Sequence, residues 1–133
     1  MIVLDEQLLG RQLDSTIAHW YRGHVVYITD LRPTTVIKDD AIPVLLRQSP
    51  QPTFVTINAT DFWQRIPPEP YFCIVCCALS DPQVPLIPLL LRQLLHHPRI
   101  RTKAQRMGMM IRLSKRGAVY YTSRDSTIQD ISF

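Results

Sequence analysis

Apolar residues recur along the chain in short runs separated by polar segments. Four runs are strand-like because they are rich in apolar, β-branched or aromatic residues: 1–4, 25–29, 53–57 and 71–79. The last, YFCIVCCAL, is continuously apolar, which is typical of a strand buried on both faces of a sheet. Residues 109–122 contain two further runs around a Ser-Lys-Arg-Gly turn and predict a β-hairpin near the carboxyl end.

Three segments repeat apolar side chains at the spacing of a helix. Residues 8–20 form the first and are expected to end near Gly23. The second begins near Asp39 or Asp40, either of which could cap it, and the third spans residues 83–97 after a Ser-Asp-Pro stop. The expected buried face of the second helix consists of Ile42, Leu45 and Leu46.

The order of these elements defines the fold class. Strands that alternate with helices predict an α/β protein, a three-layer α/β/α sandwich with a mostly parallel sheet and the hairpin at its carboxyl end. Because crossovers in such sheets are right-handed, the carboxyl ends of the strands share one edge, where ligands bind. The length of 133 residues suits one domain, expected over residues 1–125, with residues 126–133 frayed.

The composition argues against a membrane or secreted protein. The longest apolar stretch, residues 84–95, is interrupted by Pro85, Pro88 and Arg92 and is too short to cross a bilayer. The first residues, MIVLDEQ, carry an acidic pair where a signal peptide would be positively charged. We therefore expect a cytoplasmic protein without membrane contact.

Three cysteines, Cys73, Cys76 and Cys77, lie in the central apolar run. A Cys-x-x-Cys pair suggests zinc or redox chemistry, but strand residues three apart point to opposite faces. No second Cys or His pair follows at ligand spacing. We interpret the three as reduced thiols buried in the core.

Charge is distributed unevenly along the chain. Residues 1–81 have a balance of −3, whereas residues 82–133 have a balance of +7. This pattern suits a cation site next to a surface that binds a polyanion, although a solvated cationic surface without a ligand would look the same. The candidate nucleic-acid surface consists of Arg99, Arg101, Lys103, Arg106, Lys115 and Arg116.

Acidic residues follow each of the first four strand-like runs. They are Asp5, Asp30, Asp61 and Asp81, and Asp39 opens the helix after the second run. Carboxylates that converge in one crevice repel unless a cation neutralises them, and an all-oxygen ligand set favours Mg²⁺ or Mn²⁺. Each acid, Asp30 and Asp81 above all, could equally be a helix cap or an Asx-turn.

Four segments resemble, in order and spacing, the small PIN-like family related to the Mut7-type C-terminal domain. They are Ile2-Val3-Leu4-Asp5-Glu6-Gln7-Leu8, Gly23 to Leu31 (GHVVYITDL), Asp39-Asp40-Ala41-Ile42 and Val55 to Phe62 (VTINATDF). The resemblance covers about the first 80 residues. It implies a PIN-like fold, and the wider superfamily includes VapC-type toxins, which cleave RNA with Mg²⁺.

The resemblance implies a catalytic and metal-binding set of Asp5, Asp39 and Asp61, with Asp40 a substitute one position after Asp39. Asp61 matches the last acid of the family's Thr-Arg-Asp-x-Asp-Phe pattern. This sequence has Asn58 where an acid is usual, and its spacing is one residue longer. We expect Asn58 to be a weakened metal ligand at this site. We also expect Asp81 to be a fourth acid there.

Two functions follow as expectations. The first is a Mg²⁺- or Mn²⁺-dependent ribonuclease of the toxin type, which binds RNA and acts beside a small antitoxin protein, with a homodimer as its assembly. The second is a PIN-like binding or interaction module that has lost catalysis through changes such as Asn58.

Overall fold

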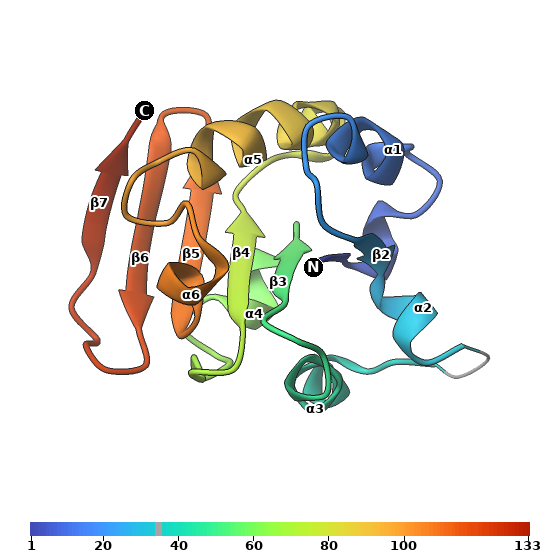
Figure 1. Ribbon diagram of the computed structural model, residues 1–133, viewed down its shortest axis with the longest axis horizontal. Coiled ribbons are helices and arrows are strands. Elements are labelled where there is room, and N and C mark those ends of the chain that lie inside the picture. The colour runs from blue at the N-terminus through green and yellow to red at the C-terminus, as the bar shows by residue number, and fades with distance from the viewer. Residues whose placement is uncertain (34–35) are drawn as a thin grey trace.

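The computed structural model describes residues 1–33 and 36–133, and within them the chain forms a seven-stranded mixed sheet (Figure 1). The strand order is β2-β1-β3-β4-β5-β6-β7. Strands β2 to β5 in this order pair in parallel, and β6 and β7 are antiparallel to their neighbours. The strands are β1 (Ile2–Leu4), β2 (Val25–Tyr27), β3 (Thr53–Thr56), β4 (Cys73–Cys77), β5 (Met109–Ser114), β6 (Gly117–Thr122) and β7 (Gln129–Ser132). The α/β class, the mostly parallel sheet and the β5–β6 hairpin are thus confirmed.

Helices connect the strands and pack on both faces of the sheet. They are η1 (Glu6–Leu8), α1 (Leu13–Ala18), α2 (Ile28–Leu31), η2 (Asp39–Ala41), α3 (Ile42–Arg47), α4 (Ala59–Phe62), η3 (Asp81–Leu86), α5 (Ile87–Leu95) and α6 (Lys103–Arg106), of which the η elements are 3₁₀ helices. The expected inward face of α3 is buried as predicted.

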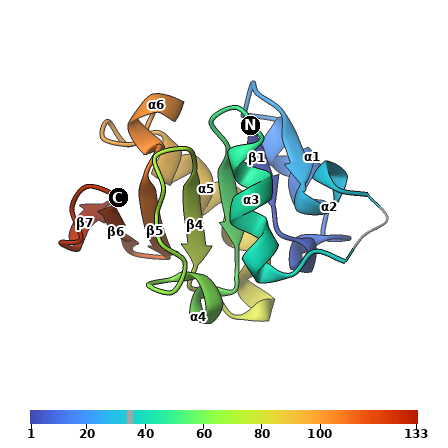
Figure 2. The same cartoon turned by 90° about the horizontal axis from the view of Figure 1, so that it is seen from below.

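Alternation along the strands divides the core into two clusters. Leu4, Val55 and Val75 face α1 and α5, which lie side by side (Figure 1). Val3 and Phe54 belong to the other cluster, which includes the buried side chains of α3 and α4. In Figure 2, α3 and α4 lie toward the β1–β4 half of the sheet, whereas β6 and β7 lie at its other end.

Two predicted elements are shorter than expected because local backbone geometry interrupts them. The helix expected over residues 8–20 is divided into η1 and α1, since Gly10 and Gln12 both have positive φ (75° and 59°). The strand expected over residues 25–29 ends at Tyr27, where the backbone N–H donates to Asp30 Oδ2 (2.9 Å) and α2 begins. Asp30 therefore acts as a helix-start residue.

The carboxyl-terminal segment corrects another expectation. Residues 126–133 were expected to be frayed, but Gln129–Ser132 form β7, which pairs with β6, and Ile131 is buried. This close pairing requires glycine at position 117, because a Cβ there would collide with the Ile131 carbonyl oxygen. The alternation of polar and apolar residues over residues 130–133 (DISF) is the strand pattern that the sequence interpretation missed.

The cysteines lie in β4, as predicted, and all three are free and buried. Cys73 and Cys77 belong to one core cluster and Cys76 to the other, as expected for alternating strand residues. Burial raises the pKa of Cys73 and of Cys76 to about 12, so neither thiol ionises near neutral pH. Among the described helices, none is both long and apolar enough to span a membrane.

Candidate functional site

Asp5 is held at the carboxyl edge of the sheet by the pairing of β1 with β3. Its backbone N–H donates to the Val55 carbonyl (2.9 Å), which extends the ladder by one residue beyond Leu4. The side chain is 5% exposed, and Thr56 Oγ1 donates a hydrogen bond to its Oδ2 at 2.6 Å. Asp5 is thus a nearly buried carboxylate fixed by the last residue of the adjacent strand.

The turn after β3 connects Asp5 to Asp61. Thr56 Oγ1 also accepts from the backbone N–H of Asn58 (3.0 Å). Asn58 caps α4, because its Oδ1 accepts from the Asp61 backbone N–H (3.2 Å), while its Nδ2 donates to Asp61 Oδ2 (2.7 Å). A continuous chain of hydrogen bonds therefore joins Asp5, Thr56, Asn58 and Asp61.

Asp39 is the third acid of the predicted set, and it comes from a different element. It is the first residue of η2, which leads into α3 on the same face of the sheet as α4. Burial is the main cause that raises the pKa of Asp39, the charge on Asp61 is the next, and the charges on Glu6 and Asp40 add to it. The Asp39 and Asp61 carboxyl groups are therefore close neighbours.

The electrostatics also connect Asp5 to this pair. Burial raises the pKa of Asp5, and the charges on Asp39 and Glu6 raise it further. The hydrogen bonds from Thr56 and from the Glu6 backbone oppose this rise without cancelling it. Of the three acids predicted from the sequence, Asp39 thus interacts electrostatically with both Asp5 and Asp61, and Asn58 hydrogen-bonds to Asp61.

The donor set is chemically suited to a hard cation, since it consists of carboxylate and amide oxygens. Within residues 1–33 and 36–133, however, no group of three or more His, Cys, Asp or Glu side chains is arranged so that it could hold a metal ion, and Asp5, Asp39 and Asp61 form no such group. Mg²⁺ usually keeps several waters and binds through one or two carboxylates and the phosphates of a substrate.

Asp81 has a different environment from the acid group. It begins η3 after β4, and its Oδ1 accepts from Arg11 Nη2 at 2.7 Å in an exposed ion pair. An exposed pair of this kind contributes little to stability. The structure therefore gives Asp81 a surface partner and does not place it with Asp5, Asp39 and Asp61.

The predicted nucleic-acid surface needs a larger correction. Arg106 is 2% exposed, and its guanidinium donates to Thr53 Oγ1 and to the Ile100 and Arg101 carbonyls, so it cannot contact a ligand in solvent. Thr53 begins β3, which places this region at the amino edge of the sheet, opposite the acids. Lys103 of the same helix also reaches this edge, beside the Met1 amino group. Only Lys115 and Arg116, in the turn after β5, belong to the carboxyl edge.

Thr56 is the functional residue that the sequence interpretation missed. Its hydroxyl positions Asp5 and fixes the turn that carries Asn58. The available signal was a polar residue at the last position of an otherwise apolar buried strand, TFVT. A hydroxyl in such a place needs a partner, and the carboxyl edge supplies one.

No protein-family model, curated protein or solved structure matches this chain. The resemblance to the PIN-like family therefore stays a prediction from the four sequence segments.

Proposed function

We propose that this protein is a PIN-like, Mg²⁺- or Mn²⁺-dependent ribonuclease whose catalytic acids are Asp5, Asp39 and Asp61. The observation that carries the proposal is the hydrogen-bonded turn that joins Asp5 to Asp61 through Thr56 and Asn58 at the carboxyl edge of a mostly parallel sheet, with Asp39 near enough for its charge to act on Asp5. Ligands of open α/β sheets bind at that edge. Burial is the main cause that raises the pKa of Asp5 and of Asp39, and neighbouring carboxylates raise it further, so a bound cation would favour the ionised form of both.

Each residue has a distinct role in this proposal. Asp39 and Asp61 hold the cation, and Asp5, fixed by Thr56, accepts hydrogen bonds from water molecules around it. Asn58 orients Asp61 by binding one of its two carboxylate oxygens and leaves the other free of that contact. When bound, Mg²⁺ or Mn²⁺ supplies Lewis-acid activation of water and neutralises charge on the phosphodiester.

The toxin-type function adds two partners to the proposal. A ribonuclease of this type acts beside a small antitoxin protein that inhibits it, and the resemblance also implies a homodimer. The RNA substrate would approach across the carboxyl edge, where Arg116 carries positive charge in the turn between β5 and β6.

A second candidate function is a PIN-like binding module without catalysis. The observation in its favour is the Asn58 side chain, which stands where the family pattern has an acid and donates a 2.7 Å hydrogen bond to Asp61. An amide contributes no negative charge, so cation affinity is lower than with an acid at this position. The two functions differ in whether the remaining acids still cleave RNA.

The experiment is a cleavage assay on purified protein with a labelled single-stranded RNA of mixed sequence, in Mg²⁺, in Mn²⁺ and in EDTA. We expect cleavage with either ion and none in EDTA. Asp5→Asn and Asp61→Asn should each abolish cleavage, whereas the matched control Asp81→Asn, which changes an acid outside the group, should cleave like the wild type.

Wild-type cleavage that is unchanged by both Asp5→Asn and Asp61→Asn would overturn the proposal. Absence of cleavage with either ion would favour the binding module. Asn58→Asp then sharpens the result, because aspartate also caps helices but adds a charge. We expect this change to tighten Mn²⁺ binding in calorimetry, and unchanged affinity would mean that position 58 does not contact the ion.

A further inference from the structure

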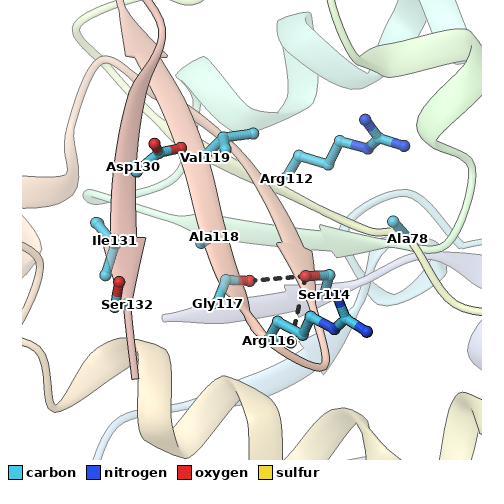
Figure 3. Close-up of a pocket in the computed structure, with 10 residues that line it drawn as sticks. All are labelled: Ala78, Arg112, Ser114, Arg116, Gly117, Ala118, Val119, Asp130, Ile131 and Ser132. Atoms are coloured by element: carbon cyan, nitrogen blue, oxygen red, sulfur yellow. Dashed lines mark hydrogen bonds between the residues drawn. The ribbon is translucent and has the colours of Figure 1, made fainter.

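A hollow lined by two arginines lies on the outer strands of the sheet, and none of its residues belongs to the acid group. Arg112 and Ser114 lie on one face of β5, and Arg116 follows in the turn to β6. Figure 3 shows the Arg112 and Arg116 side chains extending in the same direction, with Ser114 between them. Together with Ala78, Val119 and Asp130 they line a cavity of about 460 Å³.

Both arginines are available to a ligand. Arg112 and Arg116 are exposed, and no ion pair within the described residues includes either of them. Asp130 is the acid that lines the same hollow, on the β7 side of Val119 (Figure 3). The Ser114 hydroxyl donates to the Gly117 carbonyl (3.2 Å) and accepts from the Arg116 N–H (3.4 Å), which holds the turn in place.

The hollow shares both an edge and a face of the sheet with the acid group. Strand β5 is parallel to β4, and β4 to β3, so residues after β5 lie at the same carboxyl edge as Asn58 and Asp61. Arg112 is opposite Cys76, whose cluster includes the buried residues of α3 and α4, and its charge reaches that thiol. Two strand spacings, roughly 10 Å, separate the ends of β3 and β5.

We propose that this hollow binds the phosphate backbone of single-stranded RNA and positions it across the acid group. Arginine suits this role because its planar guanidinium donates two parallel hydrogen bonds to a phosphate. Two exposed guanidinium groups around one cavity can each donate to a different phosphate of a chain. The identity of RNA as the ligand rests on the proposed function, whereas the binding of a polyanion rests on the arginines alone.

The test measures RNA binding separately from cleavage. A fluorescently labelled 12-nucleotide single-stranded RNA is titrated with purified protein in EDTA, and anisotropy gives the affinity at several salt concentrations. We expect Arg112→Gln and Arg116→Gln each to weaken binding roughly tenfold, the equivalent of one charge-assisted hydrogen bond. Each should also reduce the slope of log affinity against log salt by about 0.7, the loss of one phosphate contact.

The matched control is Lys115→Gln, which removes the same charge from the same turn but from a residue that does not line the hollow. We expect it to weaken binding about twofold or less. Equal losses for Lys115→Gln and the arginine variants would mean that only net charge matters, and would overturn the proposal. Circular dichroism confirms that each variant is folded.

The remaining outcomes separate the two proposals. Arginine variants that bind RNA like the wild type but lose affinity for a polyglutamate peptide would replace RNA with an acidic protein as the ligand. RNA binding that depends on Arg112 and Arg116, with no cleavage in Mg²⁺ or Mn²⁺, would leave this inference intact and remove the ribonuclease.

Discussion

Two nearly buried charged groups, one at each edge of the sheet, have opposite surroundings. Asp5 at the carboxyl edge is 5% exposed, accepts one side-chain hydrogen bond and lies near other negative charges that raise its pKa. Arg106 at the amino edge is 2% exposed and donates to one hydroxyl and two carbonyl oxygens. Among the described residues, no buried side-chain nitrogen or oxygen lacks a partner.

The difference teaches how to separate a structural charge from a functional one. Arg106 is surrounded by acceptors that belong to the fold itself, and it fixes the loop before α6 to the start of β3. Asp5 is disfavoured in its ionised form first by burial and then by the charges on Asp39 and Glu6, and its two hydrogen bonds do not fully compensate for them. Three experiments test this contrast, in order of expected effect.

Replacement of Arg106 should have the largest effect on stability. Arg106→Leu removes the donor for the Thr53 hydroxyl and for the Ile100 and Arg101 carbonyls, and we expect it to lower the free energy of unfolding by about 3 kcal/mol. Urea denaturation followed by circular dichroism measures the change. Arg101→Leu, at an exposed neighbour, should cost no more than about 0.5 kcal/mol. A more stable Arg106→Leu variant would show that the guanidinium is a burden to the fold.

Loss of the Thr56 hydroxyl should have an intermediate effect. Thr56→Val removes the donor to Asp5 and the acceptor of the Asn58 N–H, and we expect it to destabilise the protein by about 1–2 kcal/mol at pH 7. The same change at exposed Thr60 is the control and should be nearly neutral. At acid pH, where Asp5 is protonated, Thr56→Val should cost less stability than it does at pH 7, when each value is corrected by the Thr60→Val control. Equal costs at both pH values would mean that Thr56 does not act through Asp5.

Removal of the Asp5 charge should have the smallest effect and the opposite sign. Because the pKa of Asp5 is raised above its ordinary value of 3.8, the folded state binds more protons than the unfolded state between the two values. The contribution of Asp5 to stability therefore improves as pH falls through the folded pKa and is constant below 3.8. We expect Asp5→Asn to gain on the order of 0.5 kcal/mol at pH 7 and nothing at low pH. Thermal melts across pH measure this difference, and a loss at pH 7 would contradict it.

The sequence sufficed for much of the sheet. The continuous apolar run of β4 and the periodicity of α3 report burial directly, so both were predicted correctly. The acids could be placed at one edge because parallel strands end on the same side. Thr56 could not be assigned in this way, since its partner Asp5 lies 51 residues earlier in the chain.

The basic surface was the least accurate prediction, for a topological reason. The helix after β4 returns the chain to the amino edge, so Arg99, Arg101 and Lys103 lie on the far side of the sheet from the acids. Nothing in the composition distinguishes buried Arg106 from its exposed neighbours, because its acceptors are two carbonyls and a distant threonine. Arg112, by contrast, alternates with buried residues of β5, which is the pattern of an outward-facing side chain.

The position of β1 between β2 and β3 has a consequence for the order in which the molecule assembles. Strand β1 cannot complete its pairing until residues 53–56 have been synthesised. The acid group depends on this long-range pairing, because the Asp5 carboxylate meets Thr56 only when β1 and β3 join. The β5–β6 hairpin depends on near neighbours alone and closes on a much shorter timescale. Slow closure of β1 onto β3 would thus leave a chain with its hairpin formed and its acids still apart.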